Sequence, residues 1–225
     1  MALGGCTPSK VKSAAVPGIE QYSVRTVAVL PFQTLDTPQV PDQPVHDLGA
    51  PTSVKRSDIE FAIPPSGEKL NQPTVTVPPH AGETVTRVFY RKFRHWEGIR
   101  VLRRDEIDEA IVAIGPPGGD ERLEVWAGKV ARHLSADAAI LGLVSIYRER
   151  GGSKMGGDPA VVGFEVELVA ADGRPLWKAN YYERQKPMNE DLKGFIERGG
   201  VFVRAEQLTE YGVDHVLREF PFGQA

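Results

Sequence analysis

The segment that decides the fold is Ala138–Val144, which reads AAILGLV and continues as SIYRER. Its apolar run, followed by a polar glycine-rich loop at 151–157, predicts a buried strand. Beyond that loop, apolar residues alternate with glycine or glutamate from Val162 to Leu168, which predicts a strand with one half-exposed face. Asp172-Gly173 is a tight-turn signal, so residues 176–184 are expected to return as the hairpin partner.

A second buried strand is predicted at Arg25–Phe32 (RTVAVLPF), and Pro31 ends it. From Glu83 onward, several apolar stripes have helical spacing. These stripes are Val85, Val88, Phe89, Phe93 and Trp96; Ile107, Ala110, Ile111 and Ile114; Leu123, Trp126, Val130 and Leu134; and Val213, Val216, Leu217 and Phe220. Helices interleaved with strands, followed by a meander, predict one α/β sandwich domain over residues 24–225, with a mixed sheet and helices packed on it.

A long insertion interrupts this pattern at residues 33–82. It holds nine of the 18 prolines of the chain. Proline removes backbone donors and restricts the preceding residue, so a regular helix or a central strand is not expected there. Fifty residues also exceed ordinary loop lengths. We therefore expect a proline-rich arm that lies over its own domain or over a neighbour.

The composition excludes several classes of protein. Of 225 residues, 41% are hydrophobic and 25% are charged, which is typical of a globular chain. The net charge of −3 leaves no basic surface for nucleic acid. The single cysteine, Cys6, excludes an intramolecular disulfide. No metal-ligand spacing, phosphate loop or paired catalytic groups occur, so no metal, no cofactor and no enzymatic activity are expected.

The N-terminal residues 1–23 are predicted to be a lipobox-like terminus and a polar linker. Leu3-Gly4-Gly5-Cys6 resembles the lipobox of bacterial lipoproteins, in which the cysteine receives a diacylglyceryl thioether. Thr7, in place of aspartate, resembles the outer-membrane sorting case. Only five residues precede Cys6, fewer than a signal peptide needs. Translation therefore starts upstream, or the terminus has been trimmed, or the match is a chance one in an ordinary terminus.

The order of elements resembles a group of bacterial envelope domains, namely the amino-terminal domain of TolB, the lipoprotein CsgG and the lipoprotein activators of penicillin-binding proteins. The resemblance covers about residues 24–184 apart from the insertion. It rests on the strand Val27–Phe32, the helix start Arg103–Glu106, the run Ser135–Ala138 before a strand, and the turn Ala171–Arg174 followed by Leu176-Trp177. It implies an envelope lipoprotein domain, and several relatives oligomerise through this domain.

Two groups of residues are candidates for partner binding. Arg87, Arg91 and Arg94 belong to the densest basic stretch and lie off the apolar stripe of their helix. They form either a solvated helix face or a contact for an anionic polymer such as lipopolysaccharide or exopolysaccharide. Tyr181 and Tyr182 form either a platform for sugar or peptide or ordinary cross-strand packing.

These observations predict a lipoprotein anchored through Cys6 on the periplasmic face of the outer membrane. It is expected to be a non-catalytic binding or scaffold component of the cell envelope, and homo-oligomerisation is one expected mode of assembly. Envelope proteins or polysaccharide-assembly components are the expected partners. The alternative is an envelope enzyme acting on glycan or phosphate substrates, which requires a deep pocket with converging carboxylates or histidines.

Overall fold

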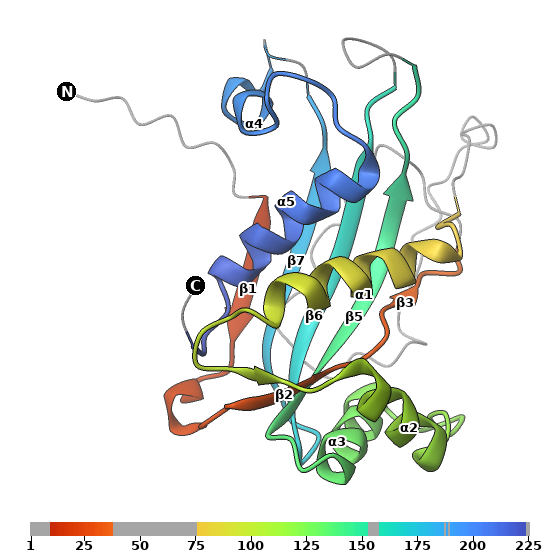
Figure 1. The fold of residues 1–225 in the computed structure, drawn as a ribbon, viewed down its shortest axis with the longest axis vertical. Coiled ribbons are helices and arrows are strands. Elements are labelled where there is room, and N and C mark those ends of the chain that lie inside the picture. Colours follow the sequence, from red (N-terminus) through yellow and green to blue (C-terminus); the bar gives the residue numbers. More distant parts are fainter. Residues whose placement is uncertain (1–9, 38–75, 153–157, 187, 189, 224–225) are drawn as a thin grey trace, which may run out of the picture.

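A computed structural model describes residues 10–37, 76–152, 158–186, 188 and 190–223 (Figure 1). The strands are β1 (Val11–Ala15), β2 (Thr26–Val29), β3 (Gln33–Thr34), β4 (Arg100–Val101), β5 (Ala138–Arg148), β6 (Val161–Ala170) and β7 (Pro175–Arg184). The helices are α1 (His80–Phe93), α2 (Arg104–Ile114), α3 (Leu123–His133), α4 (Leu192–Glu197) and α5 (Ala205–Arg218), with a short 3-10 turn at Ile19–Gln21.

The strands described form one mixed sheet in the order β1-β7-β6-β5-β2-β4. Strand β2 runs parallel to β4 and β5, and β3 continues beside β5 in the same sense. The pairs β5–β6, β6–β7 and β7–β1 are antiparallel. The predicted α/β class, with a mixed sheet and helices packed on it, is confirmed.

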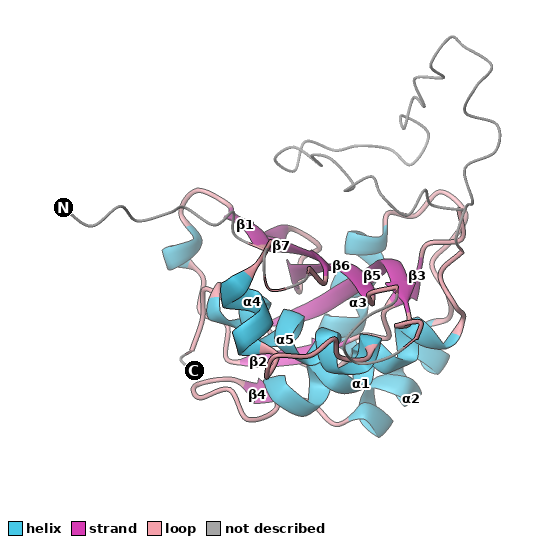
Figure 2. Ribbon diagram, turned by 90° about the horizontal axis from the view of Figure 1, so that it is seen from above, coloured by secondary structure: helices cyan, strands magenta, loops and turns pink. Residues whose placement is uncertain are grey.

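Helices cover the two faces of the sheet unequally. Helices α1 and α5 lie across one face, and α2 and α3 pack on the other face at the lower end of Figure 1. Figure 2 shows α1 and α5 along one side of β5, β6 and β7. Because successive strand residues point to opposite faces, Ile140 belongs to the larger apolar cluster and Ala139 to the smaller one.

The predicted linker within residues 1–23 is wrong at Val11–Ala15, because these residues form the edge strand β1. This strand pairs with β7, from Val11 opposite Tyr181 to Ala15 opposite Trp177. Only Val11 is buried. An edge strand held by backbone hydrogen bonds needs little apolar side chain, so its polar sequence resembled a linker.

Two other boundaries also differ from the predictions. Helix α1 begins at His80, so the insertion ends before residue 82, and β3 lies within its expected start. Proline is tolerated at a helix start, which explains why Pro79 can directly precede α1. Strand β6 is buried on nearly its whole length, whereas alternation predicted a half-exposed face. The reason is that Lys178 and Asn180 of β7 bind the Glu165 carboxylate and α3 packs near the other end of β6.

Candidate functional site

The predicted lipid acceptor, Cys6, lies outside the described residues, so its modification stays a prediction. The described chain begins at Lys10 and enters β1 at Val11. Whatever Cys6 carries is therefore separated from the folded domain by a few residues only.

The predicted basic face of α1 forms ion pairs with α5. The three pairs are Arg87 with Glu206, Arg91 with Glu210, and Lys92 with Asp214. The side chains of Arg87 and Arg91 remain about half exposed, and Arg94 is exposed just after α1 ends. These pairs fix one side of the guanidinium groups to α5. A contact of Arg87, Arg91 and Arg94 with an anionic polymer stays a prediction.

The two predicted tyrosines lie on opposite faces of β7. Tyr181 is fully buried, with its ring 5.3 Å from that of Phe164, and its hydroxyl donates to Glu183 Oε2 at 2.6 Å. Burial, followed by the charge of Glu183, raises the pKa of Tyr181 well above its usual value. Tyr181 is therefore a core residue and does not form a surface platform. Tyr182 is half-buried on the other face, and a role in binding stays a prediction for it.

A buried charged cluster joins the N-terminal strand to α4, and sequence reasoning missed it. We call it the Glu183 cluster, and it consists of Lys10, Tyr181, Glu183, Asp191 and Arg198. Glu183 accepts from Lys10 Nζ at 3.1 Å and from the Arg198 guanidinium. The Arg198 side chain is 1% exposed and also lies 3.8 Å from Asp191. Lys10 Nζ is 3.7 Å from Asp191 as well, so two cations face two carboxylates.

The Glu183 cluster fixes the position of α4. Asp191 caps this helix by accepting from the Gly194 N–H at 2.9 Å. Burial alone would raise the pKa of Asp191, but the Gly194 N–H and the charges of Lys10 and Arg198 hold that pKa below its usual value. A β-carbon at Gly194 would lie 2.6 Å from Lys10 Nζ and 2.8 Å from Arg198 Nη1, so any larger residue would force the charged ends of these side chains to move. The cluster is a structural clamp in which each cation pairs with a carboxylate, while the buried Arg198 Nε has no hydrogen-bond partner among the described residues.

Sequence reasoning missed this cluster because its members come from distant parts of the chain. Lys10 and Glu183 are 173 residues apart, and only the fold brings them together. The one local signal is Asp191, a residue that favours the start of a helix. A residue with that preference predicts α4 but says nothing of the buried ion pairs that hold it.

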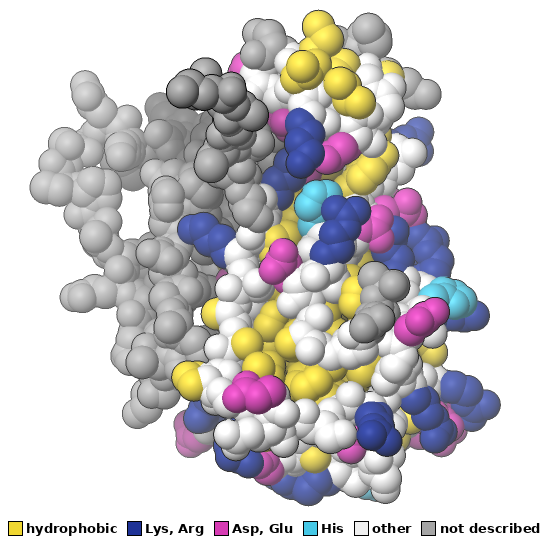
Figure 3. Space-filling model, turned by 90° about the vertical axis from the view of Figure 1, so that its left-hand side faces the viewer, with side chains coloured by type: hydrophobic (Ala, Val, Ile, Leu, Met, Phe, Trp, Pro, Cys, Tyr) yellow, Lys and Arg dark blue, Asp and Glu magenta, His cyan; other side chains and the backbone are white. Residues whose placement is uncertain are grey.

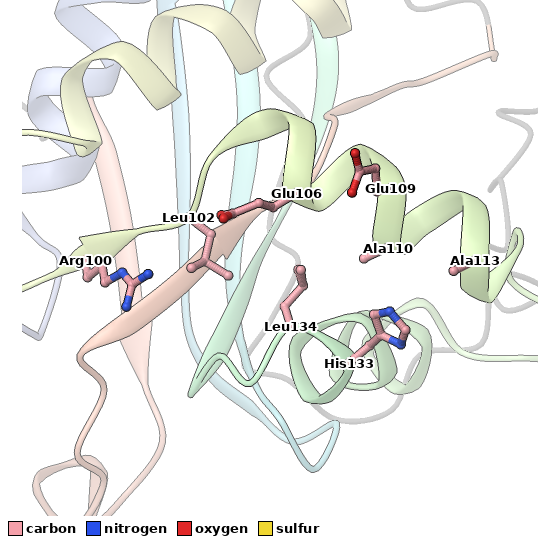
Figure 4. A pocket seen from close by; sticks show the side chains of 8 residues that line it. All are labelled: Arg100, Leu102, Glu106, Glu109, Ala110, Ala113, His133 and Leu134. Atoms are coloured by element: carbon pink, nitrogen blue, oxygen red, sulfur yellow. The ribbon is translucent and has the colours of Figure 1, made fainter.

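An open pocket of about 540 Å³ lies between α2 and α3 (Figure 4). Its polar lining includes Arg100, Glu106, Glu109 and His133. The Glu106 carboxylate accepts a hydrogen bond from the backbone N–H of Arg103 at 3.1 Å. The Glu109 carboxylate points away from the His133 ring (Figure 4). The pocket therefore lacks the converging acid and base groups that the enzymatic alternative requires.

In the described part of the chain, no group of three or more His, Cys, Asp or Glu side chains is placed to bind a metal ion. Within the same residues, no helix combines the length and apolar character needed to cross a bilayer.

No protein-family model matches the sequence, and no curated protein sequence matches it. Solved structures do resemble it. A dodecameric point variant of PelC from Paraburkholderia phytofirmans is 16% identical, with a TM-score of 0.46 over 92% of this chain and 95% of that one. Lipoprotein GNA1162 from Neisseria meningitidis is 14% identical, with a TM-score of 0.38 over 77% of this chain and 91% of that one.

The C-terminal domain of LpoB from Salmonella enterica is 10% identical, with a TM-score of 0.37 over 73% of this chain and 85% of that one. One of these similar structures is a lipoprotein. At these scores the likeness carries no conclusion about ligand, partner or activity.

Proposed function

We propose that this protein is a lipid-anchored domain of the bacterial cell envelope that acts as a non-catalytic binding or scaffold component. The observation that carries the proposal is the position of Leu3-Gly4-Gly5-Cys6 relative to the fold. Strand β1 begins at Val11, five residues after the cysteine. A lipid on Cys6 would therefore hold the domain close to the membrane surface, on a tether too short to let it diffuse far away.

The way in which the charged side chains pair with one another supports a non-catalytic role. Arg87 and Arg91 pair with α5, and the charged groups of the Glu183 cluster pair with one another. The open pocket between α2 and α3 presents Glu109 and His133 without bringing them together. Groups arranged in this way can position a partner, but they do not form the paired acid and base of hydrolysis.

The finer features of the proposal follow from the lipobox resemblance and Thr7. They support a position on the periplasmic face of the outer membrane, where envelope proteins or polysaccharide-assembly components would be its partners. Self-association belongs to the same proposal. Sedimentation velocity of the soluble domain over a range of concentrations tests it, and a ring is one assembly that this measurement would detect.

The experiment that tests the anchor compares three forms of the protein expressed from its own genomic locus. These are the parent, Cys6→Ser, and the double variant Cys6→Ser/Ser9→Cys, which moves the thiol by three residues out of the lipobox. The parent should sediment with outer membranes, and both variants should appear in the soluble periplasmic fraction. Membrane retention of Cys6→Ser equal to that of the parent would overturn the proposal.

A further inference from the structure

An apolar patch stands exposed on α4 and the residues before it. Met188 is 57% exposed, Leu192 57% and Ile196 65%, and they are three of the five large hydrophobic side chains exposed in the described residues. Leu192 and Ile196 are four residues apart and therefore lie on one side of the helix. Figure 3 shows hydrophobic side chains gathered at the end of the molecule that carries α4.

The Glu183 cluster holds this patch outward. A six-residue helix is too short to be stable by its own hydrogen bonds, so tertiary contacts must maintain α4. The buried guanidinium of Arg198, at the end of the helix, binds Glu183 and lies near Asp191. A buried charge is costly unless it is paired, and the pairing exists only while α4 keeps this position. The apolar side chains on the outer side of α4 are therefore fixed in solvent-facing positions.

The patch also lies next to the point where the N-terminal tether enters the fold. Lys10 Nζ approaches both ends of α4, at 3.7 Å from Asp191 and 3.9 Å from Glu197. Cys6 precedes Lys10 by four residues, which span at most about 14 Å when fully extended. A membrane that holds a lipid on Cys6 is therefore within reach of α4.

We propose that Met188, Leu192 and Ile196 form a membrane-contacting patch that enters the interfacial region of the bilayer to which Cys6 is anchored. This inference rests on the proposed lipid anchor. Interfacial helices bury apolar side chains about 5–10 Å into the boundary between headgroups and acyl chains. Lys193 is exposed on the same helix, and a lysine stem can cover apolar surface while its ammonium stays in water.

The small size of the patch favours a bilayer over a protein as its occupant. A stable protein interface buries about 800 Å² on each partner, far more than two side chains on a short helix and one just before it present. A membrane contact needs no such area, because the lipid on Cys6 supplies the affinity and the patch only sets the orientation. Helices α2 and α3, with their open pocket, lie at the opposite end of the long axis and would then face away from the membrane (Figure 1).

The test uses the lone thiol of the chain. Cys6 is coupled to a maleimide-headgroup lipid in vesicles of phosphatidylethanolamine and phosphatidylglycerol, which places a lipid there without any cellular enzyme. Ile196→Trp introduces a fluorophore into the patch, and Val112→Trp, at a side chain 83% exposed on α2, is the matched control. The signal of the parent protein, with its own three tryptophans, is subtracted.

On tethering, the added fluorescence of Ile196→Trp should shift to shorter wavelength, and brominated acyl chains should quench it. Val112→Trp should show neither effect. Adding Leu192→Glu to Ile196→Trp should reduce the quenching. Unquenched Ile196→Trp on tethered protein, or equal quenching at both positions, would overturn the proposal. A shift that depends on protein concentration without vesicles would also overturn it, because a second copy would then cover the patch.

Different results would overturn the proposed lipid anchor and the proposed membrane-contacting patch. Because maleimide coupling bypasses cellular lipidation, a protein that carries no lipid in cells would overturn the proposed function whatever the fluorescence shows. A lipidated protein whose tethered Ile196→Trp form is not quenched would overturn the patch alone.

Discussion

Glu167 is a carboxyl group whose proton should respond to pH near neutrality. It lies on β6 opposite Lys178 of β7. Burial raises the pKa of Glu167 to about 7, against the attraction of Lys178 and with further repulsion from Glu124 and Glu165. An acid whose pKa is higher in the folded protein binds its proton more tightly there, so ionising it costs folding free energy.

We expect this cost to appear as pH rises from about 4.3, the usual pKa of an unfolded glutamate, through about 7. The contribution of Glu167 to stability is complete below that window and lost above it. Glu167→Gln keeps the shape and removes the titration. It should be more stable than the parent at pH 8, on the order of 1–3 kcal/mol, with a smaller difference at pH 4.5.

Urea unfolding of both proteins at the two pH values measures this. All other titrating groups are common to the pair, so the difference between the proteins isolates Glu167. Parallel pH dependences in parent and variant would show that the Glu167 carboxyl is not buried as described.

At the scale of elements, the approach of α5 to β7 depends on a glycine. Gly212 lies in α5 directly over the Tyr181 ring, and a β-carbon there would come within 2.8 Å of Cζ and closer to its neighbours. Gly212→Ala should therefore destabilise the protein by about 1–3 kcal/mol through overpacking. This loss would appear even though alanine favours a helix interior over glycine by about 1 kcal/mol.

The matched control is Gly119→Ala, where an added β-carbon would have no atom within 4 Å. It should change stability by no more than about 0.5 kcal/mol. Thermal unfolding of the two variants beside the parent gives the comparison. A Gly212→Ala protein as stable as the control would mean that α5 does not pack as closely on β7 as the structure shows.

The elements that the sequence predicted correctly are those whose side chains carry the pattern. Strand β5 and helices α1 and α5 bury regular apolar stripes, and Val85, Ile140 and Val216 are fully buried. Strand β1 was not predicted, because an edge strand is held by backbone pairing and needs no regular apolar pattern in its side chains. The burial of Glu165 within β6 was not predicted, because its partners Lys178 and Asn180 become its neighbours only through the register of the hairpin.

The candidate site was less predictable than the fold for the same reason. Arg87 and Arg91 could be placed on an exposed helix face from spacing, but their partners on α5 lie more than a hundred residues away. Tyr181 was recognised as a strand residue, whereas its full burial depends on α5 packing over it. The exposed side of α4 depends on the Glu183 cluster, which no local pattern indicates.

At the scale of the whole molecule, the elements on either side of the proline-rich arm, β3 and α1, contact each other. Strand β3 ends at Thr34, and α1 begins at His80. Deleting residues 38–75 and joining the ends with a short glycine-serine linker should therefore leave one cooperative thermal transition near that of the parent, since loop closure depends only weakly on length. The deletion should instead weaken self-association or partner binding, which sedimentation detects. Loss of the transition would place the arm in the core.

The central claim concerns the attachment of the whole domain to a membrane, and incorporation of an alkyne palmitate analogue tests it most directly. The protein is expressed from its own genomic locus with a C-terminal epitope tag, captured, and conjugated to a fluorophore. The parent should be labelled, whereas Cys6→Ser and Cys6→Ser/Ser9→Cys should not, because acylation requires the thiol at its place in the lipobox. An unlabelled parent, or labelling that persists in Cys6→Ser, would contradict the account.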